Sequence, residues 1–282
     1  HCPGDSSGSS WHKSSCIFSL LCPRAARILE MATTLKDGRK LMVFDDDKAM
    51  AVELIAQVTA AANEAIGAKG SFSLCIPAGS VVSALKGLDP AAVDWSKVNV
   101  FFTGERLGQN KSYAAALDAF CDKCKIRNVF YPLIRPLFSE GSPLPTFAVT
   151  ESAASYDALL KSHPAIDNSG AMPSFDMLLL GVGDDGHCGS LHPKSEHIKA
   201  TGSGTITFGI PKEGKNQIAI SMDVMNASKK VILACTGEKK KDAVKMALSG
   251  EFEEFNCPAA LVKAAETMWF ADKASMADYT PA

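Results

Sequence analysis

The feature that most constrains the fold is an alternation that begins at Leu41 and continues through the chain. A short apolar run is followed by a turn, and the turn by a longer segment with an apolar residue at every third or fourth position. This succession is typical of a parallel sheet whose strands are connected by crossover helices. We therefore expect one α/β domain, with helices on both faces of a parallel-sheet core.

The expected elements follow from the period of the apolar residues. Strands are expected at residues 41–44, 72–76, 98–102, 147–149, 177–180, 218–221 and 231–235. Helices are expected at residues 49–66, 112–124, 152–161, 239–248 and 258–265.

Composition excludes several classes of protein. The 29 Lys and Arg residues nearly balance the 31 Asp and Glu residues, so nucleic acid is not an expected partner. Apolar runs fall short of the roughly 18 residues that span a bilayer, so no membrane partner is expected either. The nine cysteines are an odd number without framework spacing, which indicates free thiols in a reducing compartment and therefore a cytoplasmic location.

The first 38 residues differ in composition from the rest, being rich in Ser and carrying Arg24 and Arg27. One interpretation is a transit-type leader, which would direct the protein to a plastid or a mitochondrion. The other is that Met31 is the true start and the preceding residues are leftover translated sequence. In either case we expect residues 39–282 to form the folded domain.

A glycine-rich turn follows the apolar strand at residues 177–180, and the sequence there reads Gly-Val-Gly-Asp-Asp-Gly-His from Gly181 to His187. In an open α/β sheet such a turn lies at the carboxyl ends of the strands, where ligands bind. Glycine allows close approach of a ligand to the backbone, and Asp185 is near enough to orient His187.

This pattern indicates general base catalysis by His187. A neutral imidazole, with an ordinary pKa of about 6.5, can accept a proton from water that attacks an ester-like carbonyl. The alternative is an ordinary strand-to-helix turn in which the aspartate caps a helix and the histidine is a satisfied polar residue.

The rest of the motif resembles the 6-phosphogluconolactonases, whose signature is Gly-x-Gly-x-Asp-Gly-His-Thr-Ala-Ser-Leu-Phe-Pro. The residues that match in register are Gly181, Gly183, Asp185, Gly186, His187, Ser190, Leu191 and Pro193. The resemblance implies the Rossmann-like, NagB/RpiA-like fold that this family shares with the glucosamine-6-phosphate deaminases. It also implies that His187 is the base and Asp185 its neighbour.

Further resemblances point to the groups that would bind a sugar phosphate. Gly79 and Ser80 follow an expected strand and open a helix, whose free N–H groups suit phosphate. Arg106 stands in the position of the family's phosphate-binding arginine, and a guanidinium grips phosphate oxygens bidentately. Lys240 stands at the family's phosphate-side lysine, and Gly183 completes the expected substrate-binding set.

The resemblance implies hydrolysis of a phosphosugar lactone, 6-phospho-D-glucono-1,5-lactone, without a cofactor. It also implies a functional link to glucose-6-phosphate dehydrogenase. Two alternatives stay open: a deaminase-like sugar-phosphate isomerase, and a sugar-phosphate-binding protein without turnover. The latter is suggested by Pro77, Ala78 and Gly104, which depart from the family pattern.

No metal site is expected from the sequence. His187, His192 and His197, with Cys188, are the side chains that suggest one, since imidazole and thiolate bind zinc. Histidines spaced by five residues, however, do not share one face of a helix.

Overall fold

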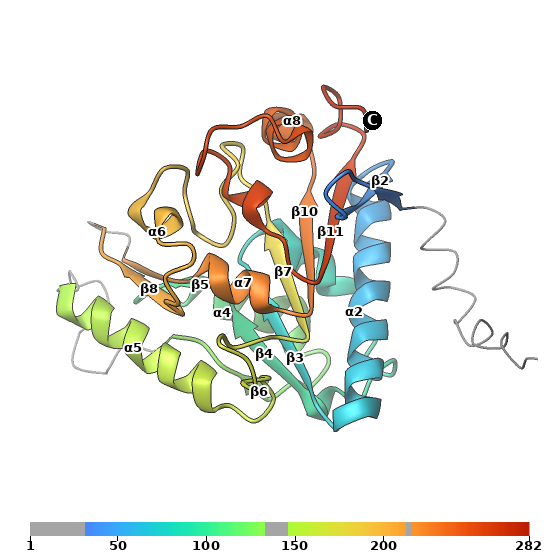
Figure 1. Cartoon of the computed structure of the whole chain (residues 1–282). Coiled ribbons are helices and arrows are strands. Elements are labelled where there is room, and N and C mark those ends of the chain that lie inside the picture. Colours follow the sequence, from blue (N-terminus) through green and yellow to red (C-terminus); the bar gives the residue numbers. More distant parts are fainter. Residues whose placement is uncertain (1–31, 133–145, 213–215, 282) are drawn as a thin grey trace, which may run out of the picture. The chain divides into compact units, whose positions relative to one another are not determined.

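Within residues 32–132, 146–212 and 216–281, which the computed structural model describes, an eight-stranded sheet has the order β1-β2-β11-β10-β7-β3-β4-β6 (Figure 1). Its strands are β1 (Thr33–Thr34), β2 (Lys40–Phe44), β3 (Phe72–Ile76), β4 (Val98–Phe102), β6 (Asn128–Val129), β7 (Met177–Gly181), β10 (Lys230–Cys235) and β11 (Glu266–Asp272). The β1–β2 pair is antiparallel, and the other pairs are parallel. This confirms the expected α/β class.

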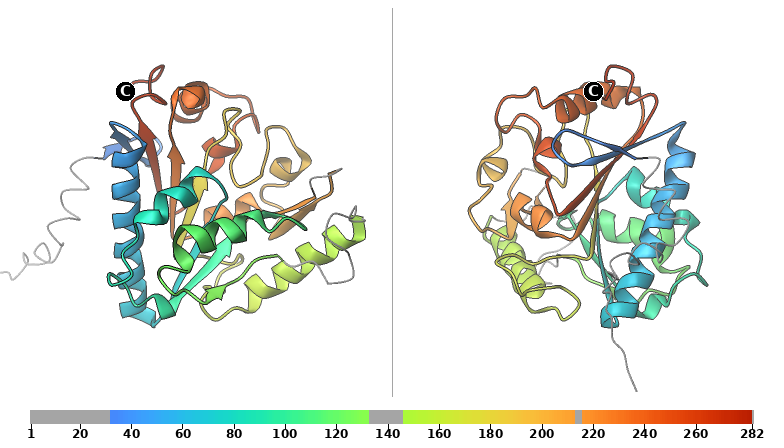
Figure 2. Two further views of the ribbon diagram at one scale, coloured as in Figure 1. Left: turned by 180° about the vertical axis from the view of Figure 1, so that it is seen from behind. Right: turned by 45° about the vertical axis from the view of Figure 1, so that its right-hand side comes forward.

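Helices cover both faces of the sheet. The α-helices are α2 (Asp47–Lys69), α3 (Ser80–Ala84), α4 (Lys111–Ala116), α5 (Thr146–Ser162), α6 (Glu196–Lys199), α7 (Met222–Ala227) and α8 (Lys241–Ser249). The right-hand view of Figure 2 shows α2, α3 and α4 on one side of the sheet and α5 and α7 on the other. In the described part of the chain, no helix is long and apolar enough to cross a membrane.

The longest helix illustrates how local sequence defines an element. The Asp46 side chain accepts a hydrogen bond from the Ala49 N–H at 2.8 Å and so caps the start of α2. At the other end Gly70 adopts a left-handed conformation with φ 81°, and its N–H donates to the Ile66 carbonyl. Between these caps the alanine-rich segment has high helix propensity.

The core lies around the central strands, which are covered on both faces. Every residue of β3 and of β4 is buried, as are four of the five in β7. Such strands read as continuous apolar runs rather than alternating ones. This explains why the short runs in the sequence located them well.

The chain adds strands toward one edge of the sheet and then toward the other. From β3 it proceeds to β4 and β6 on one side, and from β7 it proceeds to β10 and β11 on the other side. The reversal lies between β7 and β3, which pair directly. In open parallel sheets, ligands bind outside the carboxyl ends of the strands at this kind of switch point.

Several expected elements are wrong or incomplete. Residues 147–149 lie within helix α5 rather than in a strand. Phe147 is exposed and Val149 is buried, and residues two positions apart lie on different faces of a helix but on the same face of a strand. Residues 218–221 overlap β9 (Gln217–Ile220), which belongs to a separate antiparallel sheet of the order β5-β9-β8. The other two strands of this sheet are β5 (Gly104–Arg106) and β8 (Thr207–Ile210).

Two expected helices are shorter than the pattern indicates. Residues 112–124 form α4 followed by a π-helical turn, Leu117–Cys121. Residues 258–265 contain only the 3-10 helix η5 (Pro258–Leu261), which has proline at its start. Strand β11 was not expected, although it pairs with both β2 and β10.

The folded unit starts before the boundary expected between residues 38 and 39. Thr33–Ala282 forms one compact unit, in which Thr33 pairs with Leu41 and Leu35 is buried in the core. Most of the expected leader, residues 1–31, lies outside the described residues.

Candidate active site

Four loops meet at the carboxyl edge of the sheet. They follow β3, β4, β7 and β10, which are neighbours in the strand order. Because these strands are parallel, their carboxyl ends lie at the same edge. The glycine-rich turn after β7 therefore stands between the loop that contains Gly79 and the loop that contains Lys240.

Backbone hydrogen bonds hold the turn after β7 in a closed shape. The Gly183 N–H donates to the His187 carbonyl at 2.8 Å, and the Gly186 N–H donates to the Gly183 carbonyl at 3.2 Å. The Ala259 N–H from η5 donates to the Gly186 carbonyl at 3.0 Å. The turn is therefore braced from within and also by a segment distant in sequence.

Two glycines of the turn are required for different reasons. Gly186 has φ 82°, a conformation that other residues rarely adopt. Gly183 does not have positive φ, but a Cβ added there would collide with the ring of His187. The imidazole thus packs against the backbone of Gly183, a residue that the sequence predicted to bind substrate.

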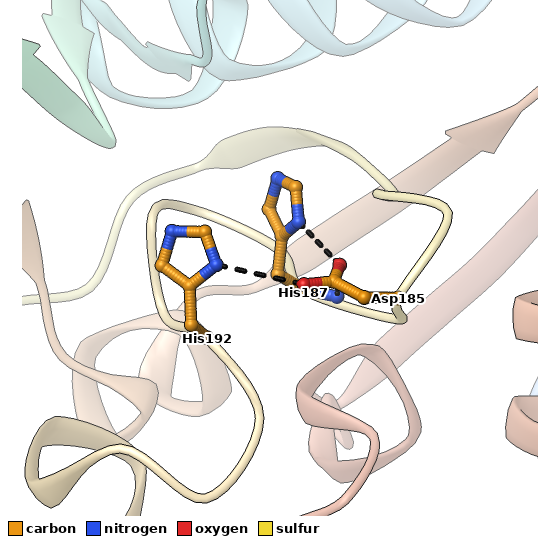
Figure 3. A group of neighbouring side chains, drawn as sticks. All are labelled: Asp185, His187 and His192. Atoms are coloured by element: carbon orange, nitrogen blue, oxygen red, sulfur yellow. Dashed lines mark hydrogen bonds and ion pairs between the residues drawn. The ribbon is translucent and has the colours of Figure 1, made fainter.

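His187 and Asp185 form a closely coupled pair (Figure 3). The His187 Nδ1 lies 2.5 Å from Asp185 Oδ1, and the His187 backbone N–H donates to the same oxygen at 3.0 Å. The His187 side chain is 35% exposed. With Nδ1–H donating to the carboxylate, the Nε2 lone pair points away from Asp185 and is available to accept a proton.

A second imidazole shares the same carboxylate. The His192 Nδ1 lies 3.6 Å from Asp185 Oδ2, and the centroids of the His187 and His192 rings are 4.7 Å apart. The chain reverses between the two histidines because Gly189 and Ser190 both have positive φ, 54° and 66°. That reversal returns His192 to the side of Asp185.

The carboxylate of Asp185 stays ionised because of these contacts. Partial burial pushes its pKa upward, but hydrogen bonds from the His187 backbone and ring, together with the nearby His192 ring, outweigh that effect. The pKa of Asp185 is therefore below its ordinary value. A fixed negative charge beside Nδ1 holds the ring in one orientation.

Arg106 is the last residue of β5, and its side chain is exposed. Its backbone N–H donates to the Glu105 carboxylate at 2.8 Å, and the same carboxylate accepts from the N–H groups of Ser112 and Tyr113. Glu105 is buried, so it ties the end of β5 to the start of α4. The backbone that carries Arg106 is thereby anchored, while its side chain extends from an exposed position.

The loop after β10 is anchored by an aspartate. Both carboxylate oxygens of Asp272 accept from the Gly237 N–H at 3.0 Å. Gly237 has φ 91° and starts the 3-10 helix η4 (Glu238–Lys240). Burial raises the pKa of Cys235 to about 12, and the positive charge of Lys240 opposes that rise. Lys240 is half-buried, and its charge is near the end of β10.

The other expected substrate residues, Gly79 and Ser80, are exposed at the start of α3. Gly79 has φ 87°, and its carbonyl accepts from the N–H groups of Val82 and Ser83. The expected residues after β3, β4, β7 and β10 thus all follow strands of one sheet edge. Among the described residues, no hydrogen bond or ion pair joins the side chain of Arg106 or Lys240 to the His187 ring.

Comparison with known proteins decides the family. The model of the glucosamine-6-phosphate isomerases/6-phosphogluconolactonase family matches residues 45–269. The chain belongs to this family. It is 30% identical over 253 residues to the 6-phosphogluconolactonase of Streptomyces coelicolor, covering 86% of this chain and 95% of the relative. It is also 30% identical to a probable chloroplastic 6-phosphogluconolactonase 4 of rice, Oryza sativa subsp. indica, covering 83% and 75% of the two chains.

A solved structure of this glucosamine-6-phosphate isomerase/6-phosphogluconolactonase family has the same fold. The 6-phosphogluconolactonase of Trypanosoma brucei superposes with a TM-score of 0.74 at 18% identity, covering 85% of this chain and 98% of that one. This likeness confirms the expected NagB-like architecture.

One departure from the family signature has a structural explanation. A Cβ added at Gly104 would lie 2.8 Å from the Ile218 carbonyl oxygen and 2.9 Å from the Ser190 hydroxyl. The 6-phosphogluconolactonases that the sequence resembles have aspartate at this position, and such a side chain does not fit here without movement of the β9 backbone at Ile218.

Three residues that lie in the site region were not predicted from the sequence to belong to it. Glu105 and Asp272 were not singled out by any pattern, and His192 was considered only as a metal ligand and rejected. A signal existed for the first two, since an acidic residue in an apolar surrounding is rarely buried unless it is paired. Nothing in the local sequence indicated that His192 returns to Asp185.

Proposed function

We propose that this chain is a 6-phosphogluconolactonase, which hydrolyses 6-phospho-D-glucono-1,5-lactone to 6-phosphogluconate. The observation that carries the proposal is the imidazole of His187, oriented by Asp185 and open to solvent at the switch point of the sheet. Support also comes from the names of the relatives in its family.

In the proposed mechanism, His187 is the general base. A water oxygen adds to the lactone carbonyl carbon while its proton passes to Nε2, and the carbonyl electron pair moves to the oxygen. Collapse of this tetrahedral intermediate breaks the bond between the carbonyl carbon and the ring oxygen, which takes the proton from the imidazolium. Asp185 stabilises the imidazolium between the two steps. The scheme uses no cofactor.

Substrate binding in this proposal depends on positive charge away from the carbonyl. Arg106 and Lys240 would hold the phosphate, together with the N–H groups beside Gly79 and Ser80. Binding energy from the phosphate then positions the ring for attack. Asp272 is proposed to position Lys240 through Gly237 rather than to touch substrate.

The lactone substrate implies an enzyme that supplies it by oxidising a sugar phosphate at its first carbon. A functional link to glucose-6-phosphate dehydrogenase stays a prediction. A reducing compartment also stays a prediction, consistent with the free and buried state of the six cysteines among the described residues.

The test is a lactonase assay on the full chain with chelator present and spontaneous hydrolysis subtracted. We expect wild-type turnover, and a fall in kcat of about 10²–10⁴-fold in His187→Ala, since that is the typical contribution of a general base. Asp184→Asn is the matched control, because Asp184 is an exposed acid in the same turn. Full activity in His187→Ala would contradict the assigned role.

The two alternatives give different results in the same experiment. Release of ammonia from glucosamine 6-phosphate would assign the chain to the isomerase branch of its family. Calorimetric binding of 6-phosphogluconate without hydrolysis of the lactone would indicate a binding protein.

A further inference from the structure

Asp185, His187 and His192 bring three potential metal ligands together on one exposed loop (Figure 3). One carboxylate oxygen and one ring nitrogen of each histidine lie within 4.8 Å of one another. Tetrahedral zinc with bonds of roughly 2.0–2.1 Å separates its ligand atoms by about 3.3 Å. The His187 Nδ1 lies 2.5 Å from Asp185 Oδ1 and the His192 Nδ1 lies 3.6 Å from Asp185 Oδ2, so each ring is close to that separation from one of the two carboxylate oxygens.

The reason for excluding a metal from the sequence does not apply to this loop. Spacing of five residues would separate two side chains on a helix, but here the left-handed Gly189 and Ser190 reverse the chain. Of the three histidines considered from the sequence, the structure brings His187 and His192 together and leaves His197 out of the cluster. His197 packs against Phe208 with ring centroids 5.1 Å apart, and Cys188 is buried.

The composition and exposure of the cluster suit a transition metal. Two imidazoles and one carboxylate are ligands that zinc accepts, and a site with three protein ligands leaves one position open. The side chains of Asp185, His187 and His192 are 49%, 35% and 54% exposed, so an ion can reach them from solvent.

We infer that Asp185, His187 and His192 form a binding site for zinc or a similar divalent transition metal, and that the bound metal inhibits the enzyme. The inhibitory part rests on the proposed lactonase function, while the binding part does not. His192 completes the ligand set. It also distinguishes this chain from the family signature, which has phenylalanine at this position.

Inhibition follows from the tautomer of His187. A metal bound at Nδ1 displaces the proton that this nitrogen donates to Asp185. A neutral imidazole then carries its one proton on Nε2, so that nitrogen has no lone pair to accept a proton from water. The metal would also engage the carboxylate that stabilises the imidazolium.

The test compares zinc binding by wild-type protein, His192→Phe and His197→Phe, all as full chains at neutral pH. Calorimetry is expected to give one zinc ion per wild-type chain, with release of protons. His192→Phe is expected to bind at least about tenfold more weakly, because it loses a ligand. His197→Phe, the matched control, is expected to bind as the wild type does.

Lactonase rates with and without zinc provide the second readout, each compared with the zinc-free rate of the same variant. We expect zinc to inhibit the wild type and His197→Phe, a chelator to restore the rate, and His192→Phe to be at least about tenfold less sensitive. Equal zinc affinity in wild type and His192→Phe would overturn the site, and activation by zinc would overturn the inhibition. If the wild type binds zinc through His192 but does not hydrolyse the lactone, the proposed function is overturned and the zinc site is not.

Discussion

Strand β7 has an aspartate near each of its ends, and the two carboxylates lie in opposite surroundings. Asp176 immediately precedes the strand and is only 8% exposed, whereas Asp185 lies in the loop after it and is 49% exposed. Both have a pKa below the ordinary value, although burial raises the pKa in each case. The groups that reverse the effect of burial differ between the two.

At the amino edge of the sheet, the partners of Asp176 come from two segments distant in sequence, residues 69–73 and Lys229. Lys69 and Lys229 contact its carboxylate oxygens at 2.9 Å and 3.1 Å, and the Ser73 N–H and hydroxyl both donate to it at 2.9 Å. The charge is therefore fully paired within the fold. A buried carboxylate in this condition joins α2, β3, β7 and β10, and its partners are all groups of the fold itself.

At the carboxyl edge, the partners of Asp185 come from its own loop. They are two imidazoles whose remaining ring nitrogens point away from the carboxylate (Figure 3). This arrangement leaves both imidazole side chains partly exposed to solvent, whereas the partners of Asp176 are occupied within the fold. The comparison shows that the same residue type can serve stability at one end of a strand and chemistry at the other, according to where its partners originate.

The largest expected effect is a separation of activity from stability by one substitution at each end. We expect Asp185→Asn to lower kcat by about 10²-fold or more, because the imidazolium loses its charged partner. Asp176→Asn should lower the free energy of unfolding by about 2–3 kcal/mol, since both lysines lose their common partner. The measurements are lactonase kinetics per folded molecule and urea unfolding of both variants. An Asp176→Asn protein with reduced kcat and wild-type stability would refute the distinction.

The next expected effect, at the lower end of the same range, concerns the glycines of the loop. Gly183→Ala should lower kcat/KM by about 10²-fold, because the added Cβ displaces the His187 ring from its position. Gly181→Ala is the control, since its Cβ would lie at an ordinary contact distance of 3.5 Å from Val81. Equal kinetics in the two variants would show that the backbone of the loop can adjust, and that its shape is less important than we infer.

The smallest expected effect concerns the pH dependence of stability at the amino edge. The folded pKa of Asp176 is lower than that of an unfolded aspartate, so its contribution to stability is present above about pH 4 and declines as the pH falls through the folded pKa. The difference in melting temperature between wild type and Asp176→Asn should thus be constant near neutral pH and shrink in acid. A difference that grows on acidification would contradict this assignment.

The sequence predicted the parts of the fold in which local pattern and environment agree. Strands β3, β4, β7 and β10 were located because they are buried on both faces and so appear as apolar runs. Residues 147–149 form a similar run, but they lie in helix α5, which packs against the small sheet. A run of three residues has no period of its own, so tertiary contacts determine its conformation.

Strand β11 was missed for a related reason. Its residues are almost all buried between β2 and β10, yet it begins with Glu266 and ends with Asp272. The carboxylate of Asp272 is tolerated there because Gly237 and Ser275 donate to it. Ser275 is a local partner, but Gly237 could not be recognised as a partner before the strands were placed side by side.

The sequence by itself determined the turn after β7, with its glycines and the pairing of Asp185 and His187. These residues are at most a few positions apart, and short-range hydrogen bonds decide their geometry. Only the tertiary structure decided that His192 returns to Asp185, that Asp272 anchors the loop of Lys240, and that Lys69 and Lys229 converge on Asp176. Those contacts arise when chain reversal and strand order bring distant groups within hydrogen-bonding range, and such proximity leaves no local pattern in the sequence.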